Sequence, residues 1–213
     1  MKVMVLNGSP RQDGNSATLA KAAAEGVLES GHQVVEVFAD DILKGFLRDC
    51  RQCRNAQGEC TIDDKFEATF IEHYLPAEGF IAATPVYWYG MSAQLKAFFD
   101  RMFCALSDSS PRSSTLLAQM QGKRLGLLIS SEETYPTVSA GIVHQMQEFA
   151  RYNGSTFVGV VYGVGNSRGE VSRDPLNPVE QARQLGRNFF DRLSTDYQID
   201  TPRSGNVWDK VIA

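Results

Sequence analysis

The chain has 213 residues, of which 43% are hydrophobic and 22% are charged, and its formal net charge at pH 7 is −4. This length and composition fit one α/β domain with a sizeable core, or at most two small domains. The acidic balance and the lack of a basic stripe argue against a general nucleic-acid binder. No apolar run approaches the roughly 20 residues that span a bilayer, and no secretory signal is visible. We expect a cytoplasmic protein without a nucleic-acid or membrane partner.

Short apolar runs alternate with amphipathic segments along most of the chain. The runs predict buried strands at residues 3–6, 33–38, 79–84, 125–130 and 157–162. Helical spacing predicts helices at residues 18–28, 63–74, 95–103, 139–152 and 178–193. Residues 40–62 look irregular, and residues 107–123, rich in Ser, Pro and Gln, are expected to form a surface excursion. Five strands alternating with helices predict an α/β fold, a doubly wound five-stranded parallel sheet with helices on both faces. We expect one domain over residues 1–195 and a C-terminal tail over residues 196–213.

The loop after the first strand is polar and runs Asn7-Gly8-Ser9-Pro10-Arg11-Gln12-Asp13-Gly14-Asn15-Ser16. Its glycines allow a tight turn, and Asn15 or Ser16 is a natural N-cap for the helix that follows. The unpaired N–H groups of a first helical turn and nearby hydroxyls favour a phosphate. The loop lacks the P-loop ending and the three-glycine dinucleotide fingerprint, so we expect neither ATP nor a pyrophosphate. An ordinary strand–helix turn is the alternative interpretation.

The loop after the third strand carries three consecutive aromatic residues, Tyr87-Trp88-Tyr89, between a proline and a glycine. Such a loop could form a flat apolar shelf, and aromatic side chains in a concave site favour a planar ligand. The alternative is a buried aromatic cluster under a loop. Ligands in open α/β sheets bind at the carboxyl ends of the strands. We therefore expect loops 7–16, 85–91 and 131–138 to meet there.

A family resemblance becomes specific at these two loops. The pairing of Leu6-Asn7-Gly8-Ser9-Pro10-Arg11 with Thr84-Pro85-Val86-Tyr87-Trp88-Tyr89-Gly90-Met91 resembles the flavodoxin-like NAD(P)H-dependent FMN reductase family. That family includes quinone reductases and iron–sulfur flavoproteins related to the multimeric flavodoxins. The likeness covers most of residues 1–195. It implies a flavodoxin-like fold, FMN as cofactor, NADH or NADPH as co-substrate, a small-molecule electron acceptor, and a homodimer or homotetramer.

The resemblance also implies a set of cofactor-binding residues. Three groups of residues would surround FMN. Ser9, Arg11, Asn15, Ser16 and Ala17 would hold its phosphate; Pro85, Val86, Tyr87, Trp88, Gly90 and Met91 would line the isoalloxazine; and Ser130, Ser131 and Glu132 would close the third side. These residue types suit the task, because a ribityl phosphate needs hydroxyl and N–H donors. Since a flavin itself supplies hydride chemistry, we expect no catalytic side chain.

Three of the four cysteines lie close together in the sequence, at Cys50, Cys53 and Cys60, and Ala56 stands where iron–sulfur members of the family carry another. A cluster would need an outside ligand, for which Cys104 is a distant candidate. Iron–sulfur clusters and structural zinc sites usually take four protein ligands. We expect no metal and a structural loop, and leave open whether its thiols are redox-active or vestigial.

Three functions remain open from the sequence. The leading hypothesis is an FMN-dependent NAD(P)H oxidoreductase that works by a ping-pong mechanism on a quinone, a nitroaromatic or a flavin. The alternatives are a non-enzymatic electron carrier, of flavodoxin or iron–sulfur flavoprotein type, and a binding module that senses a small anion. The glycine-containing residues 163–169 do not fit the dinucleotide fingerprint, and we expect an ordinary turn there without a cofactor.

Overall fold

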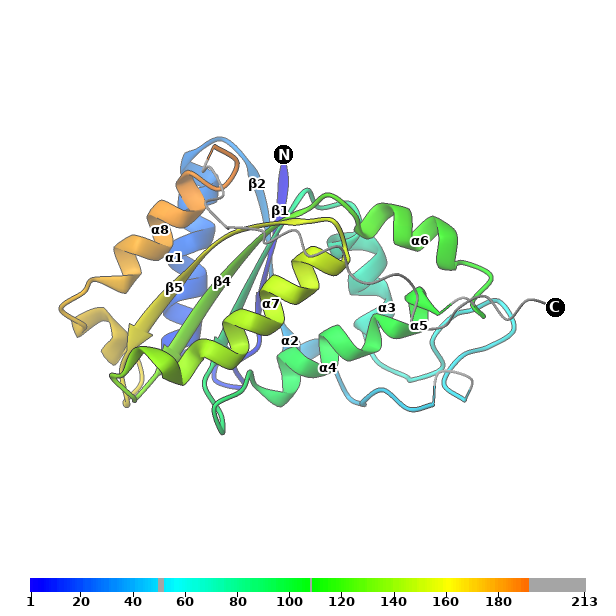
Figure 1. Ribbon diagram of the computed structural model, residues 1–213, viewed down its shortest axis with the longest axis horizontal. Helices are drawn as coiled ribbons and strands as arrows, with labels where there is room; N and C mark the ends of the chain where they lie inside the picture. The colour runs from blue at the N-terminus through cyan, green and yellow to red at the C-terminus, as the bar shows by residue number, and fades with distance from the viewer. Residues whose placement is uncertain (50–51, 108, 192–213) are drawn as a thin grey trace.

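The computed structural model describes residues 1–49, 52–107 and 109–191 of the chain (Figure 1). Within them, five parallel strands form one sheet in the order β2-β1-β3-β4-β5. This is the strand order of flavodoxin-like folds, so the predicted doubly wound parallel sheet is confirmed. The strands are β1 (Lys2–Asn7), β2 (Gln33–Phe38), β3 (Gly79–Pro85), β4 (Arg124–Ser131) and β5 (Thr156–Val164).

Helices cover both faces of the sheet, as the alternating pattern predicts (Figure 1). They are α1 (Asn15–Glu29), α2 (Ala39–Ile42), α3 (Phe66–Thr69), α4 (Ala93–Arg101), α5 (Phe103–Leu106), α6 (Ser113–Met120), α7 (Ala140–Tyr152) and α8 (Pro178–Arg187). A π-helical turn continues α3 over Phe70–Tyr74, and short 3-10 turns span Pro136–Ser139 and Glu170–Arg173. Among these described helices, none combines the length and apolar character that crossing a membrane requires.

The face covered by α1 and α8 is packed backbone against backbone. A Cβ atom added at Gly26 would lie 2.0 Å from the carbonyl oxygen of Arg183, and one added at Gly186 would lie 2.0 Å from that of Ala23. Alanines fill most of the buried positions of α1. Arg183 and Arg187 add ion pairs to Glu29 across the outside of the contact. The small residues therefore set how closely these two helices approach.

The opposite face is packed by aromatic side chains beneath α3, α4 and α7. Phe66, Phe70, Tyr74, Phe80 and Phe98 form a chain of ring contacts with centroids 5.2–6.1 Å apart. These spacings are typical of favourable stacked and edge-to-face pairs. The helical spacing of these residues predicts the buried faces correctly, although the segment after residue 65 is a short α-helix followed by a π-helical turn.

Two local features add detail to the expected elements. Residues 113–120 form α6 within the stretch expected to be a surface excursion, because Leu116 and Met120 bury one side of the helix. At the start of α8, Asn177 occupies the N-cap position in a left-handed conformation without a side-chain cap hydrogen bond, and Pro178 follows at the first helical position. The expected end of this helix at residue 193, the domain boundary at 195 and the tail over 196–213 lie outside the described residues.

Candidate functional site

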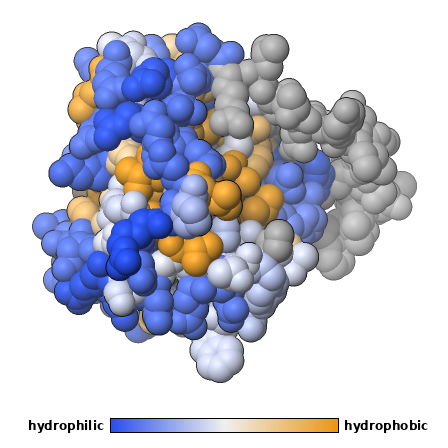
Figure 2. All heavy atoms as spheres, turned by 90° about the vertical axis from the view of Figure 1, so that its left-hand side faces the viewer, coloured by the Kyte–Doolittle hydropathy of each residue, from blue (hydrophilic) through white to orange (hydrophobic). Residues whose placement is uncertain are grey.

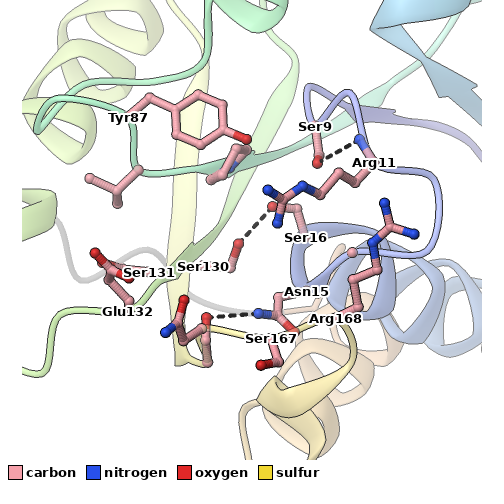
Figure 3. A pocket seen from close by; sticks show the side chains of 15 residues that line it. Ser9, Arg11, Asn15, Ser16, Tyr87, Ser130, Ser131, Glu132, Ser167 and Arg168 are labelled. Atoms are coloured by element: carbon pink, nitrogen blue, oxygen red, sulfur yellow. Dashed lines mark hydrogen bonds between the residues drawn. The ribbon is translucent and has the colours of Figure 1, made fainter.

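A cleft of about 240 Å³ opens at the carboxyl ends of the strands, where the loops after β1, β3, β4 and β5 converge (Figure 3). Figure 2 shows the side of the molecule that carries α8, where a mostly hydrophilic surface surrounds a central group of apolar side chains. The cleft is lined by Ser9, Arg11, Gly14, Asn15, Ser16, Pro85, Val86, Tyr87, Ser130, Ser131, Glu132, Gly165, Asn166, Ser167 and Arg168.

The N-terminus of α1 forms one end of this cleft. Gly14 occupies the N-cap position, and among the described residues no side chain caps the helix and its first turn holds no acidic residue. Ser9 Oγ accepts a hydrogen bond from the Arg11 N–H at 3.1 Å, and the Arg11 guanidinium extends over Ser16 into the cleft (Figure 3). Backbone N–H groups and the positive end of the helix dipole therefore face the cleft, an arrangement that favours an anion.

Buried hydroxyl groups form the floor beside this helix end. Ser16 Oγ and Ser130 Oγ lie 2.7 Å apart, and Ser9, Ser16 and Ser130 are each at most 5% exposed. The Val86 N–H donates to the Ser130 carbonyl at 2.9 Å, which ties the loops after β3 and β4 together. This pair of hydroxyls thus joins two walls of the cleft. Either hydroxyl can exchange its hydrogen bond with the other for one that it donates to a ligand.

Asn15 connects the first loop to the loop after β5 instead of capping α1, contrary to expectation. Its Nδ2 donates to the Gly165 carbonyl at 2.8 Å, and its Oδ1 accepts from the Val171 N–H at 3.2 Å. A Cβ atom at Gly165 would lie 2.7 Å from the Val171 nitrogen and 2.9 Å from Asn15 Nδ2. Only glycine allows this close approach, which brings residues 165–168 to the rim of the cleft.

The aromatic loop after β3 is a tight hairpin. Tyr87 and Gly90 exchange two backbone hydrogen bonds of 3.0 Å, and both central residues have positive φ, 50° at Trp88 and 59° at Tyr89. Such a two-residue turn normally takes Asn or Gly, and bulky residues are strained there. The Tyr87 side chain lies on the cleft wall, whereas Trp88 is 97% exposed at the tip. The hairpin therefore places one aromatic ring at the cleft and presents another to solvent.

Tyr162 supports the third wall from below. Its hydroxyl donates to the carbonyl of Glu133 at 2.5 Å, and the Glu133 N–H donates to Ser131 Oγ at 3.0 Å. Burial raises the pKa of Tyr162, so the hydroxyl stays protonated and keeps its role as donor at neutral pH. The loop after β4 is thereby fixed at the point where it borders the cleft.

The structure brings together the predicted site residues from three loops, with four exceptions. Ala17 lies on a separate hollow between α1 and β2, Met91 packs on the aromatic core, and neither Trp88 nor Gly90 lines the cleft. Sequence reasoning missed residues 165–168, because an ordinary turn was expected at residues 163–169. The usable signal was topological, because β5 is parallel to its neighbours and its carboxyl end must lie at the same edge.

Comparison with known proteins decides the family. Residues 1–190 match the family model described as NADPH-dependent FMN reductase. The chain belongs to this family. A Bacillus subtilis protein named as an NAD(P)H-dependent FMN-containing oxidoreductase is 30% identical over 189 residues, which cover 88% of this chain and 98% of that protein. FMN is thus the cofactor of this reductase-family chain, and NADH or NADPH is its co-substrate.

Two further similarities agree with this assignment. An iron–sulfur flavoprotein of Methanocaldococcus jannaschii is 27% identical over 192 residues, which cover 88% of this chain and 94% of that protein. The solved structure of the Trp repressor binding protein from Bacillus subtilis superposes with a TM-score of 0.63 at 24% identity, covering 90% of this chain and 98% of that one. The latter likeness supports the flavodoxin-like fold of this reductase-family member.

Two of the cysteines lie side by side, with Cys53 Sγ and Cys104 Sγ 3.6 Å apart. Cys50 lies outside the described residues. Within the part of the chain that the structure describes, no three or more His, Cys, Asp or Glu side chains are arranged to hold a metal ion.

Proposed function

We propose that this FMN reductase-family protein passes a hydride from NADH or NADPH through FMN to a flat acceptor, a quinone, a nitroaromatic or a flavin, by a ping-pong mechanism. One observation carries the proposal: the uncapped N-terminus of α1, the buried hydroxyls and the Tyr87 wall border a single cleft. Bound FMN would supply the hydride chemistry. The chain itself would bind FMN, orient the substrate against it and exclude water from the site.

The donor set at the end of α1 fits a phosphate. Ser9 and Ser16 would donate their hydroxyls, Arg11 would add a cation from above, and the first-turn N–H groups would complete the shell. Charge-assisted bonds of this type contribute about 1.5–3 kcal/mol each. Asn15 would act by positioning, since its side chain already holds the loop after β5.

The opposite part of the cleft suits a flat ring. Pro85, Val86 and Tyr87 form one wall, and Ser131 with Glu132 forms the other. The apolar wall would exclude water from one side of the ring, while backbone groups at residues 131–132 would be available to its polar edge. Trp88, Gly90 and Met91 belong to the same loop, and we propose that the exposed Trp88 bounds the space above the ring when a substrate is present.

The nicotinamide and the acceptor would bind in turn. Both would use the space beside the Tyr87 wall of this cleft. Exclusive occupancy of one space by two substrates is the structural basis of ping-pong kinetics. The exposed Arg11 at its rim suits an anionic nicotinamide nucleotide, whereas Arg168 at the same rim is paired with Asp13 at 2.9 Å.

Anaerobic stopped-flow tests this proposal. Each nicotinamide should bleach the flavin absorbance in a single fast phase, and steady-state rates at several acceptor concentrations should give parallel double-reciprocal lines. Quinone, nitroaromatic and flavin acceptors are then compared at matched driving force. Bleaching slower than turnover, or intersecting lines, would contradict ping-pong transfer. Bleaching absent with both nicotinamides would favour the electron-carrier alternative.

Self-association and location stay predictions. We propose a homodimer or homotetramer, because the family resemblance implies it, and a cytoplasmic location, which the sequence composition favours. Light scattering coupled to size exclusion, run with and without FMN, measures the oligomeric state, and a monomer at micromolar concentration would contradict the prediction.

A further inference from the structure

Three cysteines that the fold brings together lie apart from the FMN cleft, around the C-terminal end of α4. Cys53 Sγ contacts Cys104 Sγ at 3.6 Å, and Cys60 and Cys104 border the same small hollow. All three are free thiols. The approach is fixed by backbone contacts, since the Thr61 N–H donates to the Cys53 carbonyl at 2.9 Å and residues 54 and 60 form an antiparallel bridge. Cys104 is therefore a common neighbour of the other two sulfurs.

Charged groups surround Cys60 specifically. Arg101 Nη2 lies 3.3 Å from Cys60 Sγ, and the same guanidinium forms a fully buried ion pair with Asp64. Glu67 accepts a hydrogen bond from the Cys60 N–H at 2.9 Å and pairs with Arg112 at 2.8 Å. A guanidinium held in this way by a carboxylate cannot turn away from the sulfur, so it stabilises the thiolate.

The Cys60 thiolate is therefore favoured over the thiol. The hydrogen bond from Cys104 lowers the pKa of Cys60 to about 5 against the opposing effect of burial, with further help from the Ile62 N–H and from Arg101. The interaction with Cys60, followed by burial and the contact with Cys53, raises the pKa of Cys104, which stays a protonated thiol. A thiolate next to a protonated thiol is the arrangement of an attacking and a resolving cysteine.

The space beside Cys60 limits what can reach it. A hollow of about 20 Å³ borders Cys60, Cys104, Arg101 and Arg112, and Cys60 itself is half-buried. Space of this size accommodates roughly one water molecule. A molecule as small as hydrogen peroxide, or the hydroperoxide end of a larger one, can therefore contact the sulfur, whereas a bulky disulfide cannot.

We propose that Cys60 is an oxidation site for hydroperoxides, with Cys104 as the resolving thiol. The Cys60 sulfur attacks the hydrogen-bearing peroxide oxygen, so an S–O bond forms as the O–O bond breaks. The leaving alkoxide, or hydroxide, takes a proton from water. The Cys104 sulfur then attacks Cys60, an S–S bond replaces the S–O bond, and the Cys104 proton leaves with the hydroxide as water. Two thiols lose two electrons, and one hydroperoxide is reduced to an alcohol or water.

The sequence makes the site testable residue by residue, because trypsin places each cysteine on its own peptide. Cleavage gives residues 49–51, 52–54, 55–65 and 102–112. FMN-loaded protein treated with one equivalent of hydrogen peroxide, alkylated and digested should lose two free thiols and yield peptide 55–65 linked to 102–112. Linkage of 52–54 to 102–112 in its place would overturn the assignment of Cys60, and full retention of free thiols would overturn the proposal.

Serine variants separate the two roles. Cys104→Ser should leave a sulfenic acid on Cys60, which dimedone labels on peptide 55–65. Cys60→Ser should abolish labelling and linkage, while Cys50→Ser serves as the matched control and should react as wild type does. Flavin content and melting temperature, measured on each variant, identify any that fails to fold. Dimedone labelling of peptide 52–54 in Cys104→Ser would contradict the assigned roles.

Two further readouts make the proposal stricter. The rate at which peroxide consumes the thiols should change less than twofold between pH 6 and pH 8. For an ordinary thiol with a pKa near 8.5, the thiolate fraction, and with it the rate, would rise roughly 80-fold from pH 6 to pH 8. Treatment with a chelator tests whether the cysteines bind a metal ion instead. If the chelator releases a metal ion, and only its removal allows the three thiols to be alkylated, the cysteines are metal ligands and the proposal is overturned.

Discussion

The two faces of the sheet solve the same packing problem in different ways. On one face, α1 and α8 approach until backbone atoms meet, with Gly26 and Gly186 at the contact. On the other, large rings such as Phe80 and Phe98 separate the helices from the sheet. The first face supplies the α1 end of the cleft that we propose for FMN, and the second carries the aromatic hairpin and the three cysteines.

This difference indicates which face of the sheet can tolerate substitutions. A contact between backbones has no flexible part that can move, so the position of α1, and with it the phosphate end of the cleft, is fixed rigidly. A contact between side chains can repack. The rigid face therefore suits cofactor binding, and the repackable face can place a reactive thiolate and a strained hairpin without losing the fold.

The largest expected effect on stability comes from a substitution between α1 and α8. Gly186→Ala puts a Cβ atom 2.0 Å from the Ala23 carbonyl oxygen, and the overlap should cost about 3 kcal/mol, the upper end of overpacking penalties. For a chain of this size the melting temperature should fall by roughly 6–12 °C. FMN affinity should fall as well, because α1 must shift. Thermal melting and FMN titration measure both effects.

Gly141→Ala is the matched control for that prediction. It lies on α7, where an added Cβ would have its nearest contact at an ordinary 3.5 Å, from the Tyr89 carbonyl oxygen. Alanine should stabilise this helix by up to about 1 kcal/mol. Equal melting temperatures for the two variants would refute the contrast between the faces.

A smaller effect tests the phosphate end without disturbing the packing. Changing Ser9 and Ser16 together to Ala removes two hydroxyl donors from the cleft, and each charge-assisted bond is worth about 1.5–3 kcal/mol. FMN affinity should fall by roughly a hundredfold or more. Ser30→Ala, at the other end of α1, also removes a side-chain hydrogen bond and should leave FMN binding unchanged. Retention of FMN by the double variant through dialysis, as in wild type, would place the phosphate elsewhere.

The smallest effect on stability concerns the hairpin. Trp88 is 97% exposed, so Trp88→Ala should change the free energy of unfolding by no more than about 0.5 kcal/mol. A buried aromatic would instead cost about 3–5 kcal/mol. We expect normal FMN affinity and slower flavin reduction, because the side chain would no longer bound the substrate space. Phe46→Ala, another exposed aromatic, is the control. Unchanged reduction kinetics would remove Trp88 from the site.

The sequence carried the sheet and most of the cleft because both follow from short-range signals. Apolar runs at residues 3–6 and 79–84 can only be buried strands in this pattern, and parallel strands bring their following loops to one edge. The same rule applies to residues 165–168: they follow the carboxyl end of β5, which predicts a position at the cleft although their glycine spacing does not fit a dinucleotide fingerprint.

The rest depends on long-range geometry. Asn15 caps nothing because a hydrogen bond to Gly165, 150 residues away, competes successfully for its side chain. Trp88 reaches solvent because a two-residue turn, which no propensity favours for aromatics, reverses the chain. Cys104 meets Cys53 only because the fold places α5 beside residue 53. Such contacts lie beyond any local pattern.

The central claim is that the α1 end of the cleft holds the phosphate of FMN. The most direct measurement compares the dissociation constants of FMN and riboflavin for the wild-type apoprotein, by quenching of flavin fluorescence. Two charge-assisted hydrogen bonds of about 1.5 kcal/mol each correspond to roughly a hundredfold or more in affinity. We therefore expect FMN to bind at least about 100-fold more tightly than riboflavin. Equal affinities for the two flavins would contradict the account, because the phosphate would then make no use of the helix end.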